Sequence, residues 1–123
     1  MKKYTVLAFL LVGLSYFSQA QTTRKGNQET AIIKVPTVQC QECKERIEKY
    51  LGHEEGILKV NVDPKKKVAT VTYLYAKTNV ENVKAMIANV GYDADDVTAE
   101  PDAYKRLPTC CKKPEDGGGH EKH

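Results

Sequence analysis

The stretch VQCQEC at residues 38–43 decides both the fold and the chemistry of this chain. It places Cys40 and Cys43 three residues apart, after an apolar run at 31–35 and at the start of a helical pattern. Because positions i and i+3 of a helix lie on the same side, the two sulfurs can converge on one small target. The free N–H groups at a helix start favour negative charge, which lowers thiol pKa values. Such a pair suits either binding of a soft metal ion or cycling through a disulfide.

The residues after this stretch predict a helix from Gln41 to about Gly52. Ile47 and Leu51 repeat at i, i+4 and mark its apolar stripe, while charged residues cover the other face. Cys43 lies four residues before Ile47 and therefore close to the same stripe. We expect Cys43 to be more buried than Cys40.

The rest of the chain supplies strands and one more helix. Alternating or β-branched residues predict strands. A helical pattern follows a cap at Thr78 or Asn79 and is ended by Gly91. The segment after Gly91 predicts a weak, polar strand. The predicted strands cover 29–35, 58–62, 68–75 and 92–100, and the second helix ends at 90. The order strand-helix-strand-strand-helix-strand over 29–100 indicates an α+β, ferredoxin-like βαββαβ sandwich. Its four-stranded antiparallel sheet would carry both helices on one face.

The first twenty residues have the pattern of a signal peptide. A basic start is followed by an apolar run and by small residues at Ser18 and Ala20. We expect cleavage after Ala20, which would deliver the protein to the periplasm or outside the cell; the alternative is a retained membrane anchor. Residues 21–28 are polar and predict a flexible lead-in.

The charge of the remaining chain argues against nucleic acid as a partner. Loss of Lys2 and Lys3 with the leader lowers the 19 basic residues to 17 against 16 acidic ones, a net charge of +1. No Ser/His/Asp set, phosphate loop or carboxylate pair indicates hydrolysis. The sequence favours a binding protein, not an enzyme.

The extension 101–123 carries a second cysteine pair. We expect one short turn at 101–107, then Cys110 and Cys111, then a disordered tail that contains His120 and His123. Four cysteines in an exported chain also favour disulfides, so Cys110 and Cys111 have several readings. They can pair with Cys40 or Cys43, with another chain, or with each other, and they can bind metal.

The chain resembles the heavy-metal-associated domain family, which includes small copper chaperones, the soluble ends of copper-pumping ATPases and the periplasmic mercury-binding protein. The family loop Gly-Met-Thr-Cys-x-x-Cys corresponds to TVQCQEC at 37–43, and GI at 56–57 and GYDA at 91–94 also resemble the family. The resemblance implies one metal ion held by Cys40 and Cys43. It also implies that Val38 packs beneath the loop in place of the family methionine. Tyr92 then either faces the metal site or is an ordinary aromatic residue at the core edge.

Two thiolates select Cu(I), Hg(II) or Zn(II), and a two-sulfur site suits Cu(I) or Hg(II) best because Zn(II) prefers four ligands. Copper leads because the family most often serves it. If the extension folds back, Cys110 and Cys111 could raise the coordination to three or four. His120 and His123 could add a weak site for Cu(II) or Zn(II). The protein would sequester the ion or pass it to a membrane metal transporter or another metal-binding domain, as a monomer or a metal-bridged dimer.

Two other hypotheses use the same cysteines. In a thiol–disulfide oxidoreductase, Cys40 would attack and Cys43 would resolve the mixed disulfide. No thioredoxin-like pattern with a cis-proline strand accompanies them here. In a structural or adaptor domain, the pair would simply be oxidised, and the reduced protein would bind no metal.

Overall fold

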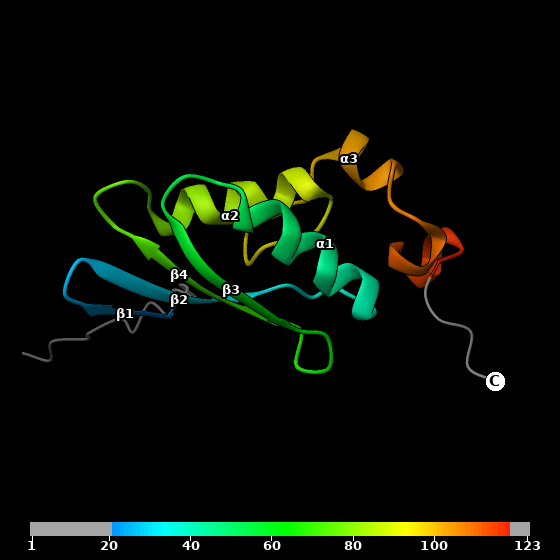
Figure 1. Cartoon of the computed structure of the whole chain (residues 1–123). Coiled ribbons are helices and arrows are strands. Elements are labelled where there is room, and N and C mark those ends of the chain that lie inside the picture. Colours follow the sequence, from blue (N-terminus) through cyan, green and yellow to red (C-terminus); the bar gives the residue numbers. More distant parts are fainter. Residues whose placement is uncertain (1–20, 119–123) are drawn as a thin grey trace, which may run out of the picture.

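A four-stranded antiparallel sheet covered on one face by two helices forms the body of the molecule (Figure 1). The computed structural model describes residues 21–118; the leader 1–20, His120 and His123 lie outside them. The strands are β1 (Gln21–Lys25), β2 (Gln28–Lys34), β3 (Ile57–Asp63) and β4 (Val68–Leu74). The helices are α1 (Gln41–Gly52), α2 (Val80–Val90), α3 (Pro101–Lys105) and the 3-10 helices η1 (Thr109–Cys111) and η2 (Pro114–Asp116). Among the described residues, no helix combines the length and the apolar character needed to cross a membrane.

The core lies between the sheet and the helices because the strands alternate. Ala31 and Ile33 of β2 and Val71 of β4 have no exposed surface and point toward the helices. Ile47 of α1 and Ile87 of α2 are equally buried against them. This arrangement confirms the predicted ferredoxin-like class.

Both large helices begin and end where their sequences place the caps. Helix α1 spans the predicted residues, and Cys40 is its N-cap residue. Helix α2 begins after Asn79, whose side chain accepts a hydrogen bond from the Asn82 N–H at 2.8 Å. It ends at Gly91, which has a φ of 113° that an L-residue rarely adopts. The cap of α1 therefore places Cys40 at the N-terminal end of this helix.

The edge of the sheet beside β2 differs from the prediction. The strand order is β1-β2-β4-β3, so β1 pairs along β2 and forms one edge of the sheet, and the segment 92–100 contributes no strand to it. The prediction of a flexible lead-in at 21–28 was therefore wrong. Gly26, with a φ of 62°, takes the first position of a two-residue hairpin turn, the place where a type II′ turn favours glycine.

The segment after α2 forms a turn and not a strand because its aspartates bind backbone groups: the Asp93 carboxylate accepts from the Ala99 N–H at 2.8 Å within the segment, and Asp95 binds the end of β2. Its only bridge joins Ala94 to Val97, and Asp95 has a positive φ of 50°. Asp95 caps the end of β2: its carboxylate accepts from the Lys34 N–H at 2.8 Å, and its own N–H donates to the Lys34 carbonyl at 2.8 Å. The predicted fourth strand at 92–100 was wrong for this reason.

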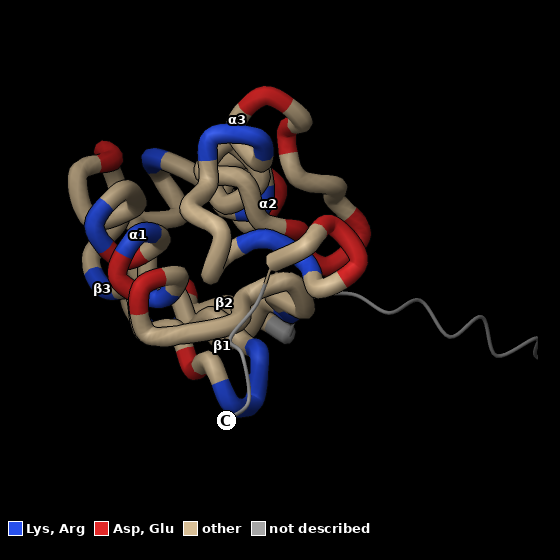
Figure 2. Tube along the Cα trace, turned by 90° about the vertical axis from the view of Figure 1, so that its right-hand side faces the viewer, with Lys and Arg blue, Asp and Glu red and all other residues tan. Residues whose placement is uncertain are grey.

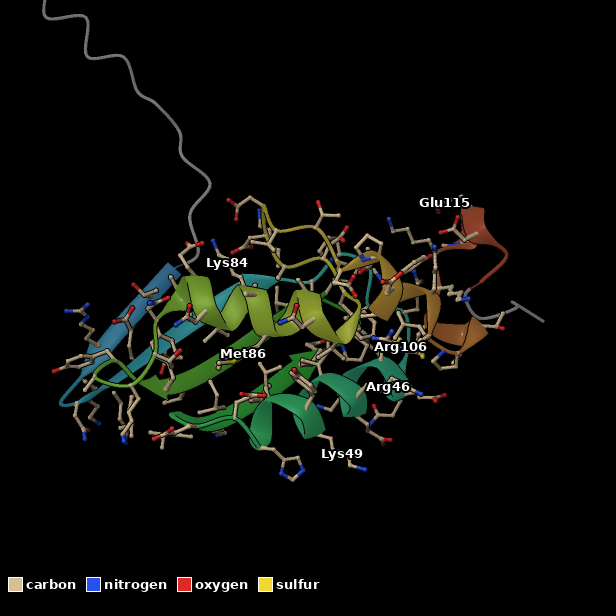
Figure 3. All side chains as sticks on the ribbon, turned by 90° about the horizontal axis from the view of Figure 1, so that it is seen from above. Arg46, Lys49, Lys84, Met86, Arg106 and Glu115 are labelled. Carbon is tan, nitrogen blue, oxygen red and sulfur yellow. The ribbon has the colours of Figure 1, made fainter. Side chains whose placement is uncertain are left out.

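A buried amine also holds this turn. Lys84 of α2, labelled in Figure 3, has a side chain only 6% exposed, and its Nζ lies 3.1 Å from Asp96 and 3.7 Å from Asp95. Burial acts to lower the pKa of Lys84, but the hydrogen bonds that its amine donates to Asp96 and Glu81 outweigh it and raise the pKa, so the amine stays charged. This ion cluster fixes the turn against α2 without any strand pairing.

Glu29 of β2 links the edge strand β1 to the rest of the sheet, and its contacts predict that the free energy of unfolding depends on pH. Its carboxylate accepts from Arg24 of β1 at 2.6 Å and from the buried Tyr73 hydroxyl of β4 at 2.9 Å. The hydrogen bond from Arg24, followed by that from Tyr73, holds the pKa of Glu29 below its ordinary value of 4.5. The stabilisation is therefore present above about pH 4.5 and is lost as the pH falls through the folded-state pKa.

We expect Glu29→Gln to lower the free energy of unfolding at pH 7 and to reduce its decline between pH 5 and 3, measured by urea denaturation. Glu55→Gln is the control, because Glu55 is an exposed glutamate whose carboxylate pairs with the surface residue Lys77. Equal pH slopes for the parent and Glu29→Gln would contradict the assignment.

The C-terminal extension is ordered as far as it is described, so the expected disordered tail was wrong for 112–118. Glu100 caps α3 through the N–H groups of Asp102 and Ala103, and Leu107 is buried in the core. The Tyr104 hydroxyl donates to Asp116 and accepts from the Lys113 N–H at 2.9 Å. Figure 1 shows the result: the orange and red extension lies beside the first turn of α1.

Candidate metal centre

The loop 35–40 leads from the end of β2 to Cys40, the N-cap residue of α1, and Cys43 lies in the first turn of that helix. Val38 in this loop has no exposed surface, as the resemblance implied, and packs in the core. The Thr37 hydroxyl accepts a hydrogen bond from the Asp93 N–H at 3.1 Å, and the Lys67 ammonium donates a hydrogen bond to the Val38 carbonyl. The loop is therefore held from both sides, and no sequence pattern indicates the Lys67 contact.

Cys40 and Cys43 converge as their spacing predicts. Their Sγ atoms lie 3.3 Å apart at the N-terminal end of α1. Cys43 is fully buried and Cys40 is 7% exposed, which confirms the predicted difference in burial.

The second cysteine pair joins the first. The Sγ atom of Cys111 lies 2.8 Å from that of Cys43 and 4.0 Å from that of Cys40. The Sγ atom of Cys110 lies 3.9 Å from that of Cys111. All four are free thiols in the structure, and the extension brings them into one cluster (the four-sulfur cluster).

The thiols of Cys43 and Cys111 have pKa values that are shifted in opposite directions. Burial acts to raise the pKa of Cys43, but hydrogen bonding with Cys111 and with the Gln39 backbone outweighs it, so the pKa is lowered. Burial, followed by contact with Cys43, raises the pKa of Cys111. Cys43 is therefore the more readily ionised of these two thiols.

Cys110 has a different environment. Its thiol donates to the Glu42 carboxylate at 3.2 Å, and this bond, assisted by burial, raises the pKa of Cys110 to about 11. Cys110 is half-buried, whereas Cys111 is 1% exposed. The two adjacent cysteines thus face different partners.

Tyr92 faces the cluster from the loop after α2. It is fully buried, and among the described residues its hydroxyl has no partner in hydrogen-bonding geometry. Burial, and then the nearby sulfurs of Cys111 and Cys43, raise its pKa, so the hydroxyl stays protonated. Of the two readings of Tyr92, the structure places it at the sulfurs.

Around the cluster, charges of both signs alternate. Figure 2 views the molecule from the end that carries the extension and shows basic and acidic residues interspersed over it. Figure 3 shows Arg46 of α1 and Arg106 after α3 on the same side of the molecule, where both line one groove. The exposed His53 ends α1 and takes no part in the cluster.

The chain is similar to proteins that handle copper or mercury. It is 31% identical over 71 residues to a copper-exporting P-type ATPase of Staphylococcus epidermidis, which covers 58% of this chain but only 9% of that protein. It is 33% identical over 64 residues to the mercuric transport protein periplasmic component of Pseudomonas aeruginosa, covering 52% of this chain and 70% of that protein. The solved CopZ metallochaperone matches with a TM-score of 0.51 and 28% identity, over 53% of this chain and 97% of that one.

The matching region coincides with the elements that position the cysteine loop. The profile of the heavy-metal-associated domain matches residues 32–93, which include Cys40, Cys43 and Tyr92 but exclude β1 and the extension. On this match, half the chain long, the protein belongs to the heavy-metal-associated domain family.

Proposed function

We propose that this protein is an exported, non-enzymatic carrier that holds one soft metal ion, Cu(I) in the first place, through the thiolates of Cys40 and Cys43. The observation that carries the proposal is the convergence of these two sulfurs, 3.3 Å apart at the start of α1, within a heavy-metal-associated domain. Thiolates select soft ions over hard ones. A carrier needs no catalytic base, because the ion moves by exchange of sulfur ligands.

Copper is favoured over mercury and zinc on two grounds. Cu(I) accepts few sulfur ligands, whereas Zn(II) is almost always four-coordinate in structural sites. A similar ATPase is named for copper export, and a relative named for mercury supports Hg(II) as the second cargo. Zn(II) would need the second cysteine pair.

Export is supported by the leader pattern at 1–20 and by the relative named as a periplasmic component. In that compartment the protein would sequester the ion or deliver it to a membrane metal transporter or another metal-binding domain. Cysteine ligands of the partner would enter the coordination of the ion as those of this chain leave.

The test is an anaerobic titration of the reduced protein with Cu(I), followed by native mass spectrometry. We expect one tightly held Cu(I) per chain, and parallel titrations with Hg(II) and Zn(II) to rank the cargoes. Protein alkylated at its thiols is the control and should take up no copper. Absence of specific binding would contradict the proposal, and the reduction potential of the Cys40/Cys43 pair would then test the oxidoreductase hypothesis.

A further inference from the structure

The C-terminal extension reaches the cysteine loop as a built part of the fold. Leu107 is 5% exposed and anchors the segment in the core, and the Cys111 N–H donates to the Pro108 carbonyl at 2.9 Å to close η1. Lys113 also stacks its ammonium over the Tyr104 ring, 5.6 Å from the ring centroid. Cys111 is consequently delivered to a fixed place beside Cys40 and Cys43, not carried there on a loose tail.

The sulfur positions form two triangles with one common edge. Cys40 and Cys111 define this edge, 4.0 Å long. Cys43 lies on one side of it, 3.3 Å from Cys40 and 2.8 Å from Cys111. Cys110 lies on the other side, and its Sγ, Cys40 Sγ and Cys111 Sγ all lie within 4.8 Å of one another.

These distances match three-sulfur coordination better than two-sulfur coordination. With metal–sulfur bonds of about 2.3 Å, sulfurs lie about 4.0 Å apart in a trigonal site and about 4.6 Å apart in a linear one. The edge from Cys40 to Cys111 already has the trigonal length, and Cys43 needs to move outward by only about one ångström to complete the triangle. In a linear site on Cys40 and Cys43, the distance between their two sulfurs would have to grow from 3.3 Å to about 4.6 Å. Cys111 would then remain buried against the ion.

Tyr92 provides a second, independent indication of a ligand at this place. Its buried hydroxyl lies near the sulfurs of Cys111 and Cys43 and has no hydrogen-bond partner of suitable geometry within residues 21–118. A buried donor without a partner is costly, and a thiolate-bound ion supplies negative sulfurs that can accept from it.

We infer that Cys111 is the third ligand of the metal ion, so that Cys40, Cys43 and Cys111 form a closed trigonal thiolate site for Cu(I) with the extension as its lid. This inference rests on the proposed function. Cys110 stays outside the triangle because its thiol is engaged with the Glu42 carboxylate at 3.2 Å. A partner's thiolate must replace that of Cys111 on the ion before transfer, with no change in oxidation state. The lid also blocks the loop of a second copy, which favours a monomer.

Sulfur coordination numbers test the inference directly. The full chain is purified from an expressing bacterium, reduced under argon, loaded with one equivalent of Cu(I) and measured by copper X-ray absorption spectroscopy. We expect three sulfur ligands in the parent and in Cys110→Ser, and two in Cys111→Ser. In competition with a Cu(I) chelator, Cys111→Ser should bind about 10-fold or more weakly, since changes even behind the ligands cost 10–100-fold.

Cys110→Ser is the matched control, because it removes the neighbouring thiol and leaves the proposed triangle intact. Two sulfurs in the parent, or four, would overturn the inference, and so would a loss of coordination in Cys110→Ser that Cys111→Ser does not show. If Cys111→Ser fails to fold, the parent spectrum still decides. A parent that holds no copper contradicts the proposed function, whereas copper on two sulfurs in every variant contradicts only the third ligand.

Discussion

Replacement of both Cys40 and Cys43 by serine is expected to lower the Cu(I) affinity by more than about 100-fold, because changes that only disturb groups behind metal ligands already cost 10–100-fold. Serine keeps the size of cysteine and removes the soft sulfur that selects Cu(I). The remaining sulfurs of Cys110 and Cys111 are adjacent in sequence, 3.9 Å apart, and lack the support of the loop. The measurement is competition with a Cu(I) chelator under anaerobic conditions.

The control for this experiment is His120→Ala/His123→Ala, which removes the imidazoles that the sequence offers as a weak site. We expect the Cu(I) affinity to stay within about 3-fold of the parent, since imidazole is the harder ligand and Cu(I) favours thiolate. A double serine variant that retains parental affinity would contradict the assignment of Cys40 and Cys43. A circular dichroism spectrum like that of the parent would show that the fold survives the change.

The second large effect is expected at Gly91. This residue ends α2 with a φ of 113°, and a Cβ placed there would lie 3.1 Å from the backbone of Ala103 and Tyr104 in α3. We expect Gly91→Ala to lower the free energy of unfolding by about 3 kcal/mol, because backbone strain and overpacking each cost about 1–3 kcal/mol. It should also weaken Cu(I) binding, since α3 begins the segment that carries Cys111. Urea denaturation and the chelator competition measure the two effects.

Gly52 provides the matched glycine. It is the last residue of α1, its added Cβ would meet nothing within 4 Å, and its φ is not in the left-handed range. Gly52→Ala should therefore be neutral or stabilising by up to about 1 kcal/mol, through the reduced entropy of the unfolded chain. Equal losses for both variants would show that the close approach of α3 is not the cause.

The sequence was sufficient where structure is local. Helix α1 follows from its apolar stripe and the glycine at its end, and the convergence of Cys40 and Cys43 follows from their spacing alone. The β1–β2 hairpin was missed although its signal was present: Gly26-Asn27 between polar runs rich in β-branched residues is a known two-residue turn signal. The composition of 21–28 suggested flexibility because it lacks apolar residues. A strand of an antiparallel sheet can nevertheless form from polar residues, because one face of such a sheet can remain in contact with water.

The failures were those that depend on tertiary contacts. The alternation of Val97 and Ala99 suggested a strand, whereas three aspartates in the same segment bind backbone groups and the Lys84 amine. The place of Cys111 was equally beyond local reasoning, because it depends on Leu107 entering the core and on the close passage of α3 over Gly91. Neither contact leaves a periodic pattern in the sequence.

The placement of β1 at the edge of the sheet makes the N-terminal segment, and not the C-terminal one, responsible for covering β2. The extension can therefore come away from the cysteine loop and return without breaking any strand ladder. In hydrogen exchange, we expect amides of 101–118 to open as a separate cooperative unit at a lower free energy than global unfolding, while β2 and β4 amides exchange only through global unfolding. The lid and the sheet would thus respond independently to the conditions that load and empty the protein.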